Sequence, residues 1–319
     1  MSPATVFAGL LGLCALLSSS HPATCAEAFI TDQAGDEVSV LDLATQKVVA
    51  RIAVEGKPAG IAMAPDGRRA YVTSTEGKYI SVIDTASRQI LARIAFPDTP
   101  LGIAADPSGD FIYVAGFYKP YLYRIDLKTD AIVAQAETGA SPSGIAVTPD
   151  GSLIVTADRD DDQISIFDAK SLGRKATVKV GEHPFGVTID GEGTRAYTAN
   201  VEGNSVSVVD LKQASLIGNV VSGKRPYAVA LAKGHGFTTD QYGGTVSVFD
   251  LATLKPERRI SVGEYPEGIE TSADGSQVYV VNWFSNEVWA IDTQTLTVTA
   301  KMKVGDGPRA FGTFLRETF

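Results

Sequence analysis

Single-copy aromatic and charged residues in one set of loops are the strongest candidates for chemistry in this sequence. The loops either share a V-G-x-x-P motif or follow a segment similar to A-Y-V-T-S, and both kinds recur along the chain. Aromatic faces with a few guanidinium and carboxylate groups are typical of ligand and peptide sites. The candidates for such a binding site are Trp283, Phe284, Glu267, Arg309, Tyr227, Arg225, Phe185 and His183.

Groups that could catalyse a reaction are scarce. Outside the N-terminal segment there is no cysteine, and only His183 and His235 remain, which excludes a three-histidine metal site and leaves little for a Ser-His-Asp triad. Glu267 with Arg309 or His183 could polarise and hydrolyse a cyclic ester, with or without a metal ion. The sequence thus favours a non-catalytic protein and assigns no catalytic residue, and a lactonase-type hydrolase stays open as the alternative.

Polar residues end one recurring segment and could form a ring of oxygen ligands. Carboxylate and amide oxygens suit Ca²⁺ or Mg²⁺. We favour local capping, in which each side chain stabilises its own loop, and we assign no metal site. The residues are Asp32, Ser74, Gly116, Asp158, Asn200, Asp240 and Asn282.

The elements that must position all these residues follow a long repeat. A motif similar to S-V-x-D recurs every 42 residues, with one interval of 40, and a series of prolines runs in step with it. We expect each aspartate of the motif to accept N–H bonds in the turn that follows. The aspartates are Asp42, Asp84, Asp126, Asp168, Asp210, Asp250 and Asp292, and the prolines are Pro58, Pro100, Pro142, Pro184, Pro226, Pro266 and Pro308.

Each unit contains four short runs of alternating or β-branched residues, separated by P-D-G and D-x-x-T turns, with no sustained helical period. This pattern predicts an all-β, seven-bladed β-propeller of four-stranded antiparallel blades. Residues 27–57 would supply three strands of one blade and residues 308–319 its innermost strand, so the N- and C-terminal strands close the ring. Phe311, Phe314 and Leu315 should then be buried.

A propeller of this type places the first strand of each unit along the channel and gathers the candidate loops at one rim. We therefore expect binding at that rim, because the opposite face of P-D-G and D-x-x-T turns repeats its sequence too closely to be specific. Trp289 replaces a serine that most copies have, and we expect it to fill a gap between blades.

The N-terminal segment predicts export. The apolar run from Val6 to Leu17 is too short to span a bilayer and suits a secretory signal peptide, which we place at residues 1–26. Lipidation at Cys25 is the weaker alternative. Residues 27–319 would then form one domain without cysteine or a transmembrane segment, in the periplasm or secreted.

Four copies of the unit share a short motif, "AYVTS" at 70–74, "IYVAG" at 112–116, "AYTAN" at 196–200 and "VYVVN" at 278–282. On these segments the repeats resemble those of YVTN-repeat β-propellers, a family with YncE-like and lactonase-like seven-bladed members, and the resemblance covers the whole chain after the signal segment. The family includes binding proteins of unknown ligand, surface proteins, companions of quinoprotein systems and relatives of sugar lactonases. The resemblance therefore implies the architecture and leaves the activity open.

Taken together, the sequence favours a periplasmic or secreted, monomeric binding or scaffold propeller that recognises a small ligand or a protein at the channel rim. The alternatives are a lactonase-type hydrolase and an accessory protein of a quinone-linked (PQQ-type) oxidation pathway, and no cofactor can be assigned. Twenty-eight basic against 37 acidic residues give a formal charge of −9, which disfavours a nucleic-acid partner.

Overall fold

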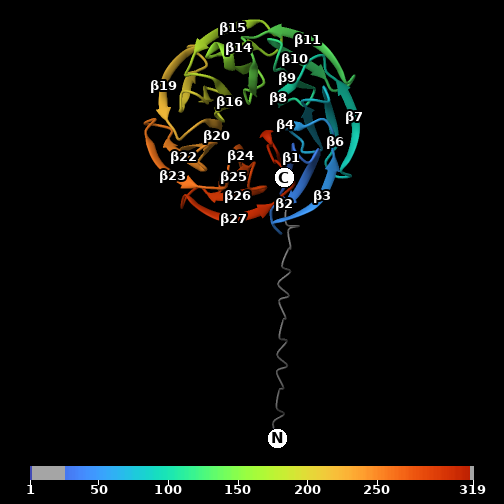
Figure 1. The fold of residues 1–319 in the computed structure, drawn as a ribbon, viewed down its shortest axis with the longest axis vertical. Coiled ribbons are helices and arrows are strands. Elements are labelled where there is room, and N and C mark those ends of the chain that lie inside the picture. The colour runs from blue at the N-terminus through green and yellow to red at the C-terminus, as the bar shows by residue number, and fades with distance from the viewer. Residues whose placement is uncertain (2–25, 317–319) are drawn as a thin grey trace.

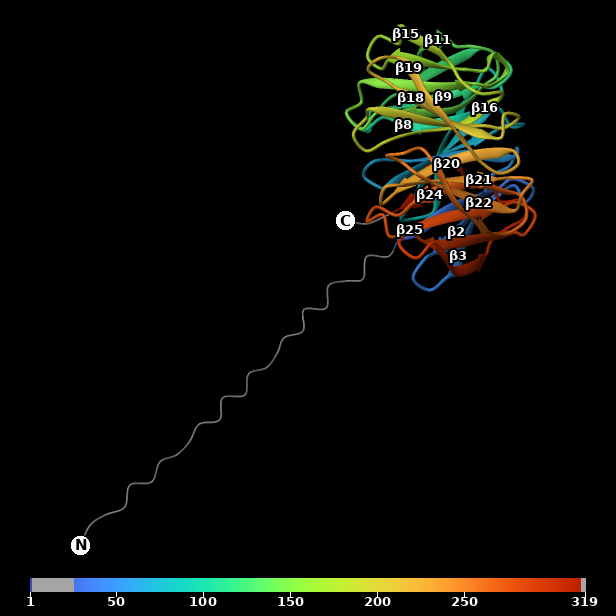
Figure 2. The same ribbon diagram turned by 90° about the vertical axis from the view of Figure 1, so that its left-hand side faces the viewer.

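Seven β-sheets surround a central channel in the computed structural model, which describes Met1 and residues 26–316 (Figure 1). Seen from the side, the ring is a thick disc (Figure 2). The seven-bladed propeller is thus confirmed, and η1 (Arg159–Asp161) is the one helical element in the described part. The predicted signal segment lies outside the described residues apart from its two ends. In the described chain there is no helix with the length and apolarity needed to cross a membrane.

Each blade runs outward from the channel in four strands. The innermost strands are β4 (Pro58–Met63), β8 (Pro100–Ala105), β12 (Pro142–Val147), β16 (Pro184–Ile189), β20 (Pro226–Ala232) and β24 (Pro266–Thr271). The second strands are β1 (Glu27–Asp32), β5 (Arg69–Ser74), β9 (Phe111–Gly116), β13 (Leu153–Asp158), β17 (Arg195–Asn200), β21 (His235–Asp240) and β25 (Gln277–Asn282).

The two outer positions complete each blade. The third strands are β2 (Glu37–Asp42), β6 (Tyr79–Asp84), β10 (Tyr121–Asp126), β14 (Gln163–Asp168), β18 (Ser205–Asp210), β22 (Thr245–Asp250) and β26 (Glu287–Asp292). The outermost strands are β3 (Lys47–Ala53), β7 (Gln89–Ala95), β11 (Ala131–Glu137), β15 (Arg174–Lys179), β19 (Ser215–Val221), β23 (Pro256–Ser261) and β27 (Thr297–Lys303).

Burial follows position in the blade. The second strands are buried on both faces because each blade packs between two others, and in β5 and β13 every residue after the first is buried. Outermost strands such as β7 alternate between exposed and half-buried residues. The sequence pattern of each strand therefore reports its distance from the channel.

A glycine in the third position of most innermost strands lets neighbouring blades approach each other. A Cβ built on Gly102 would lie 1.9 Å from the carbonyl oxygen of Ser143 in the next blade. At Gly144 it would lie 2.4 Å from the carbonyl oxygen of Phe185. The recurring P-x-G motif is thus explained by backbone packing around the channel.

The ring closes with strands from both ends of the chain, as predicted, but the C-terminal strand is divided in two. β28 (Phe311–Gly312) pairs in parallel with β4 of the next blade, and β29 (Leu315–Arg316) then pairs with β1. A carboxylate oxygen of Glu270 accepts N–H bonds from Phe314 at 2.5 Å and from Leu315 at 2.8 Å. Phe311, Phe314 and Leu315 are buried, which confirms that prediction.

Two faces of the disc differ in their loops, as predicted. On the face that we call the rim, the V-G-x-x-P loops contact the loops that follow the second strands, and Glu76 N donates to Gly56 O at 2.9 Å. On the face that we call the turn face, P-D-G turns meet the D-x-x-T turns, and Thr85 N donates to Arg68 O at 3.0 Å.

The repeated aspartates act in these turns as expected. Asp84 Oδ1 accepts from Ser87 N at 2.7 Å, and Asp292 Oδ1 accepts from Thr295 N at 2.7 Å. These hydrogen bonds lower the pKa of both carboxyl groups. The local-turn interpretation of the aspartate series is therefore confirmed.

Candidate functional site

The residue after each repeated proline faces its equivalents around the rim end of the channel. This second position differs in every blade, although the proline before it and the small residue after it recur. The ring consists of Ala59, Leu101, Ser143, Phe185, Tyr227, Glu267 and Arg309. Four of the eight sequence candidates belong to this ring. The repeat determines where the ring residues lie, and only their side chains differ between blades.

Three aromatic rings pack together at this end of the channel. The ring centroids of Phe185 and Tyr227 lie 4.4 Å apart, and Phe311 lies 5.1 Å from Phe185 and 5.5 Å from Tyr227. All three side chains are buried. With Glu267 and Arg309 they form what we call the channel closure.

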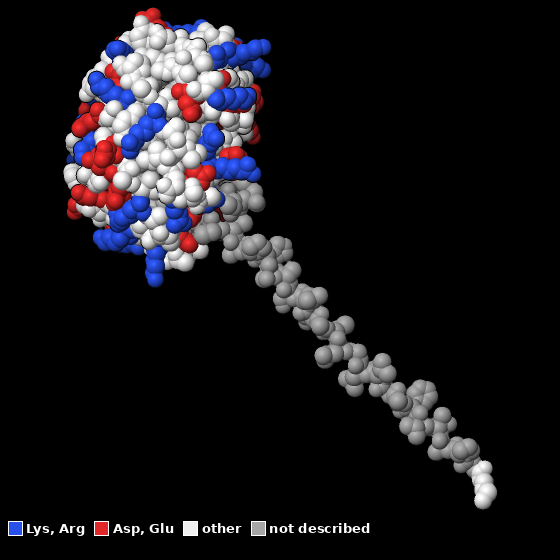
Figure 3. Space-filling model, turned by 90° about the vertical axis from the view of Figure 1, so that its right-hand side faces the viewer, with Lys and Arg blue, Asp and Glu red and all other residues white. Residues whose placement is uncertain are grey.

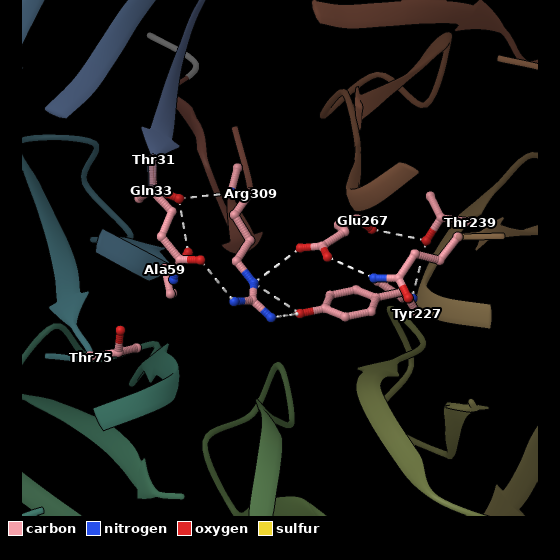
Figure 4. A network of polar contacts seen from close by, with 12 residues as sticks. Thr31, Gln33, Ala59, Thr75, Tyr227, Thr239, Glu267 and Arg309 are labelled. Atoms are coloured by element: carbon pink, nitrogen blue, oxygen red, sulfur yellow. Dashed lines mark hydrogen bonds and ion pairs between the residues drawn. The ribbon is translucent and has the colours of Figure 1, made fainter. Parts of the chain in front are cut away.

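Polar contacts complete the channel closure (Figure 4). Arg309 Nε lies 3.0 Å from Glu267 Oε2 and 3.0 Å from the hydroxyl of Tyr227, and its Nη1 donates to Gln33 at 3.2 Å. Gln241 donates to the other oxygen of Glu267 at 2.7 Å. Each charged group of the closure is therefore held by partners from several blades.

Electrostatics at the channel closure reflect burial. Burial raises the pKa of Glu267, while Arg309 and the Gln241 hydrogen bond oppose that rise. Burial works against the charge of Arg309, but Tyr227 and Glu267 outweigh it and raise the arginine pKa. Glu267 and Arg309 thus favour each other's charged form, which burial alone would disfavour.

Threonines on the second strands tie adjacent blades together just below this ring. Thr31 Oγ1 donates to Ala59 O at 2.9 Å, and Thr239 Oγ1 donates to Glu267 O at 2.9 Å (Figure 4). Because these bonds cross between blades, they fix the backbone that carries the closure.

A second group of candidates lies on the rim surface. The rings of Tyr242 and Tyr265 lie 5.5 Å apart, and those of Tyr265 and Phe284 lie 4.9 Å apart. Phe284 is 64% exposed and Tyr242 is 58% exposed. We call these three residues, from two adjacent blades, the rim aromatic cluster.

Arginines connect this cluster with its surroundings. The Arg225 guanidinium lies 4.8 Å from the ring centroid of Tyr242 and also pairs with Glu202 at 2.5 Å. Arg309 lies 5.8 Å from the ring centroid of Trp283 and 5.6 Å from that of Tyr227. Arg309 therefore links the channel closure to the half-buried Trp283 at the surface.

His183 faces a carboxylate outside the closure. Its Nδ1 lies 4.0 Å from Glu202 Oε1, the oxygen that also pairs with Arg225. Its backbone adopts φ 52°, as do several residues that precede the repeated prolines. The structure thus groups His183 with Arg225 at the rim.

Five of the seven residues that end the second strands, all but Ser74 and Gly116, have side-chain hydrogen bonds within their own blades. Asp158 Oδ2 accepts from Ser165 at 2.6 Å and from Gln163 at 3.1 Å, and such contacts support the local-capping interpretation. In the described chain, no three His, Cys, Asp or Glu side chains are grouped as metal ligands would be. Asp32 and Asp240 likewise accept from a serine seven residues later, Ser39 and Ser247, whereas the amide of Asn200 donates to Ser207.

Trp289 replaces that serine in one blade, and its polar partners lie in that blade, while the prediction that it fills a gap between blades stays a prediction. It is half-buried, its Nε1 donates to Glu287 at 2.8 Å, and the Lys301 ammonium lies 3.7 Å from its ring centroid. Both partners belong to its own blade, Glu287 on β26 and Lys301 opposite Trp289 on β27.

The structure therefore divides the predicted site into two layers. Phe185, Tyr227, Glu267 and Arg309 form the buried closure, while Arg225, His183, Trp283 and Phe284 lie above it at the rim. Tyr265, Gln241 and Gln33 also belong to these layers and were not predicted from the sequence. Tyr265 could have been found because it occupies the position before a repeated proline, where other copies carry Lys57, His183 and Arg225.

Comparisons with known proteins agree on the architecture. The family model described as "YNCE-like beta-propeller" matches residues 90–273. No curated protein matches this chain.

Solved structures with the same fold share little sequence with it. Hydrazine synthase from Kuenenia stuttgartiensis is 16% identical, with a TM-score of 0.70 over 79% of this chain and 88% of that one. A functionally unknown protein from Desulfotomaculum acetoxidans DSM 771 is 14% identical, with a TM-score of 0.77 over 90% and 98%. Dihydro-heme d1 dehydrogenase NirN in complex with DHE is 17% identical, with a TM-score of 0.68 over 89% and 64%.

Proposed function

Because the chain belongs to the YNCE-like β-propeller family, we propose that it is a non-catalytic binding protein that recognises a protein partner at the rim. The observation that carries the proposal is the exposure of Phe284 and Tyr242, whose rings pack at a tilt against the intervening Tyr265. Exposed aromatic rings on a rigid support are typical of the residues that dominate binding energy at protein interfaces.

The supporting structure of the cluster favours recognition without rearrangement. Trp283 N donates to Tyr265 O at 3.0 Å, and Phe284 N donates to Glu264 O at 3.2 Å. These bonds join the loop before β24 to the loop after β25. A preorganised surface loses little conformational entropy on binding. The rim aromatic cluster therefore suits a partner that presents apolar side chains.

The charged groups favour a protein over a polyanion. The protein carries a formal charge of −9, and on the side shown in Figure 3 acidic and basic side chains are interspersed. Arg225, beside Tyr242, is already paired with Glu202. Specificity would therefore come from aromatic contacts with a polar border rather than from an extended charged surface.

The state of Glu267 supports a binding role over ester hydrolysis. Both of its carboxylate oxygens have partners, in Arg309 and Gln241, and the side chain is buried. A general acid or base must reach the substrate. We therefore assign Glu267 to the channel closure.

The proposal includes a location outside the cytoplasm, in the periplasm or secreted, with the chain acting as a monomer. The location is supported by the sequence alone, through the apolar run at Val6–Leu17.

The test compares Tyr242→Ala with Phe284→Ala, as a double variant, against Tyr118→Ala. Tyr118 is a matched control because it is 75% exposed in the equivalent loop of another blade. Partners would be cross-linked in a cell-envelope extract, identified by mass spectrometry, purified, and titrated by calorimetry. We expect at least tenfold weaker binding by the double variant, an unchanged Tm, and wild-type affinity for Tyr118→Ala.

Two results would overturn the proposal: a purified partner that binds the double variant as tightly as the wild type, or equal weakening by Tyr118→Ala. Trp283→Ala tests whether Trp283 binds the partner or only stabilises the fold, because its ring contacts Arg309 of the channel closure. A lower Tm with undiminished partner binding would assign Trp283 to the scaffold.

A further inference from the structure

The half of the channel beyond the closure contains a cavity of about 700 Å³ that opens toward the turn face. Its lining comes from the innermost strands and from the P-D-G turns, among them Pro65, Pro107 and Pro149. We call it the channel basin. We propose that the channel basin is a second binding site, for an apolar small molecule that carries no negative charge, independent of the rim.

Side-chain size explains why this half of the channel is open. Counting each repeated proline as the first position, the fifth position carries a small residue in every blade but one, whereas the second position carries four large residues of the closure. A volume of this size is within the range of small-molecule pockets. The fifth-position residues are Ala62, Ala104, Ala146, Thr188, Ala230, Glu270 and Gly312, and all but Ala62 line the basin.

The walls are largely aliphatic. Met63, Ile103, Ile145 and Leu231 contribute to the lining, and Phe311 forms part of the end that meets the closure. Burying apolar surface of a ligand against such walls is favourable by about 25 cal/mol per Å². An apolar molecule is therefore the class of ligand that the walls fit.

The charges in the lining exclude anions. Asp190 and Glu270 line the basin, and no lysine or arginine does so among the described residues. An anion would lose its hydration and meet two carboxylates in a site of low dielectric constant. A neutral or cationic group avoids this repulsion.

The basin and the rim are separate because the closure lies between them. Tyr227 and Glu267 are buried, and of the closure residues Phe311 alone also lines the basin. A ligand would thus enter from the turn face. Its binding should not depend on the rim aromatic cluster.

A pair of fluorophores tests both the site and its charge preference. N-phenyl-1-naphthylamine is neutral and apolar, and 8-anilinonaphthalene-1-sulfonate has the same ring skeleton with one sulfonate added. We expect saturable one-to-one binding of the neutral probe to the full chain and at least tenfold weaker binding of the anionic probe. Equal affinity for both would overturn the charge argument and with it the proposal.

Variants locate the binding. Ala104→Phe with Ala146→Phe fills the basin, and Ala134→Phe with Ala176→Phe is the control, because it places the same residues on the outermost strands of the same two blades. We expect at least tenfold weaker binding of the neutral probe by the first double variant only. Ala146→Leu, a smaller change, repeats the test if the double variant does not fold.

The outcomes separate this proposal from the rim proposal. Undiminished probe binding by a folded basin variant would refute the basin as the site. Loss of probe binding in the Tyr242→Ala, Phe284→Ala variant would also refute it, because the probe would then bind at the rim. Retention of probe binding in the rim variant supports an independent site even if no protein partner is found.

Discussion

The two ends of the channel are built from the same strands and differ in the side chains that those strands carry. At the rim end the second position holds Phe185, Tyr227, Glu267 and Arg309, which fill the channel. At the turn face the fifth position holds mostly alanine, threonine and glycine, which leave a cavity of about 700 Å³. Two positions only three residues apart on the same strand thus lie at the filled end and at the open end of the channel.

The difference shows how a repeated backbone acquires a local property. Glycine or alanine in the third position is required by the approach of neighbouring blades, and Gly186, for example, has Tyr227 O 2.6 Å from where its Cβ would lie. The second and fifth positions have no such constraint, so their side chains can vary by blade. Function can therefore change at either end without loss of the fold.

Carboxyl groups at the two ends also differ. Burial raises the pKa of Asp32 to about 7 at the rim end. Hydrogen bonds from Ser276 and Ser272 lower the pKa of Asp274 to about 2 in its turn-face turn. At the rim end, burial therefore disfavours the charged form of the carboxyl groups that end second strands, whereas hydrogen bonds favour the charged form of Asp274 at the turn face.

The largest expected effect comes from removing the segment that both ends share. Deleting residues 308–319 removes Arg309 and Phe311 from the closure and Phe314 and Leu315 from the core. Each large apolar side chain contributes about 1.5–3 kcal/mol when buried, and an open ring exposes strand edges. We expect aggregation and a strongly lowered Tm, measured by calorimetry and light scattering.

A shorter truncation is the control for that deletion. Removing residues 317–319 keeps both β28 and β29 and should leave the Tm close to that of the wild type. A monomeric 308–319 deletion with an unchanged Tm would contradict closure of the ring by the C-terminal strands.

The next largest effect should come from Arg309→Met, which leaves the buried Glu267 without its cationic partner. Loss of one partner of a buried pair costs about 3–5 kcal/mol. The loss should shrink as pH falls, because the already raised pKa of Glu267 rises further and protonation removes the unpaired charge. Denaturant unfolding at several pH values measures this.

The double variant Arg309→Met, Glu267→Gln sharpens the result. It removes both charges and should recover much of the lost stability. If it were as unstable as the sum of the single variants, the charge pair would not be what stabilises the closed end.

A smaller effect is expected from Asp32→Asn, which mimics Asn200 and Asn282 in other blades. Because the folded-state pKa of Asp32 is about 7, its contribution to stability is full below about pH 4 and is lost as pH rises through 7. The variant has no carboxyl group to ionise at this position, so its stability does not fall in this pH range. At pH 8 it should be more stable than the wild type by roughly 4 kcal/mol at most. The difference between pH 5 and pH 8 is the measurement, and a parallel pH profile for both proteins would refute it.

The smallest effect is expected at the turn face, where the pKa of Asp274 is lowered and the pH dependence has the opposite sign. Asp274→Asn should leave stability at pH 8 lower than in the wild type and reduce the loss of stability as pH falls from about 4 toward 2, because the depressed pKa stabilises the charged form. The carboxylate is exposed, so solvent screening keeps the change small. A profile that changed only between pH 5 and pH 8 would contradict the contrast between the two ends.

Much of this architecture could be predicted from the sequence because it depends on short-range patterns. The aspartates of the S-V-x-D motif bond to the turns that follow them, and the P-x-G motif marks the innermost strands. Four members of the closure could also be predicted as candidates, because they vary where the rest of the unit repeats. The division of the C-terminal strand could not, since it depends on Glu270, which lies in another blade.

The sequence by itself determined the number of blades, the order of strands, the two loop faces and the closing segment, because each depends on local periodicity and turn chemistry. The tertiary structure alone decided that Glu267 and Arg309 are buried against each other, that Phe284 is exposed beside Tyr242, and that a basin opens at the turn face. These outcomes depend on distances between residues about 40 or more positions apart. Such distances are set when seven blades pack around one axis and not by any single repeat.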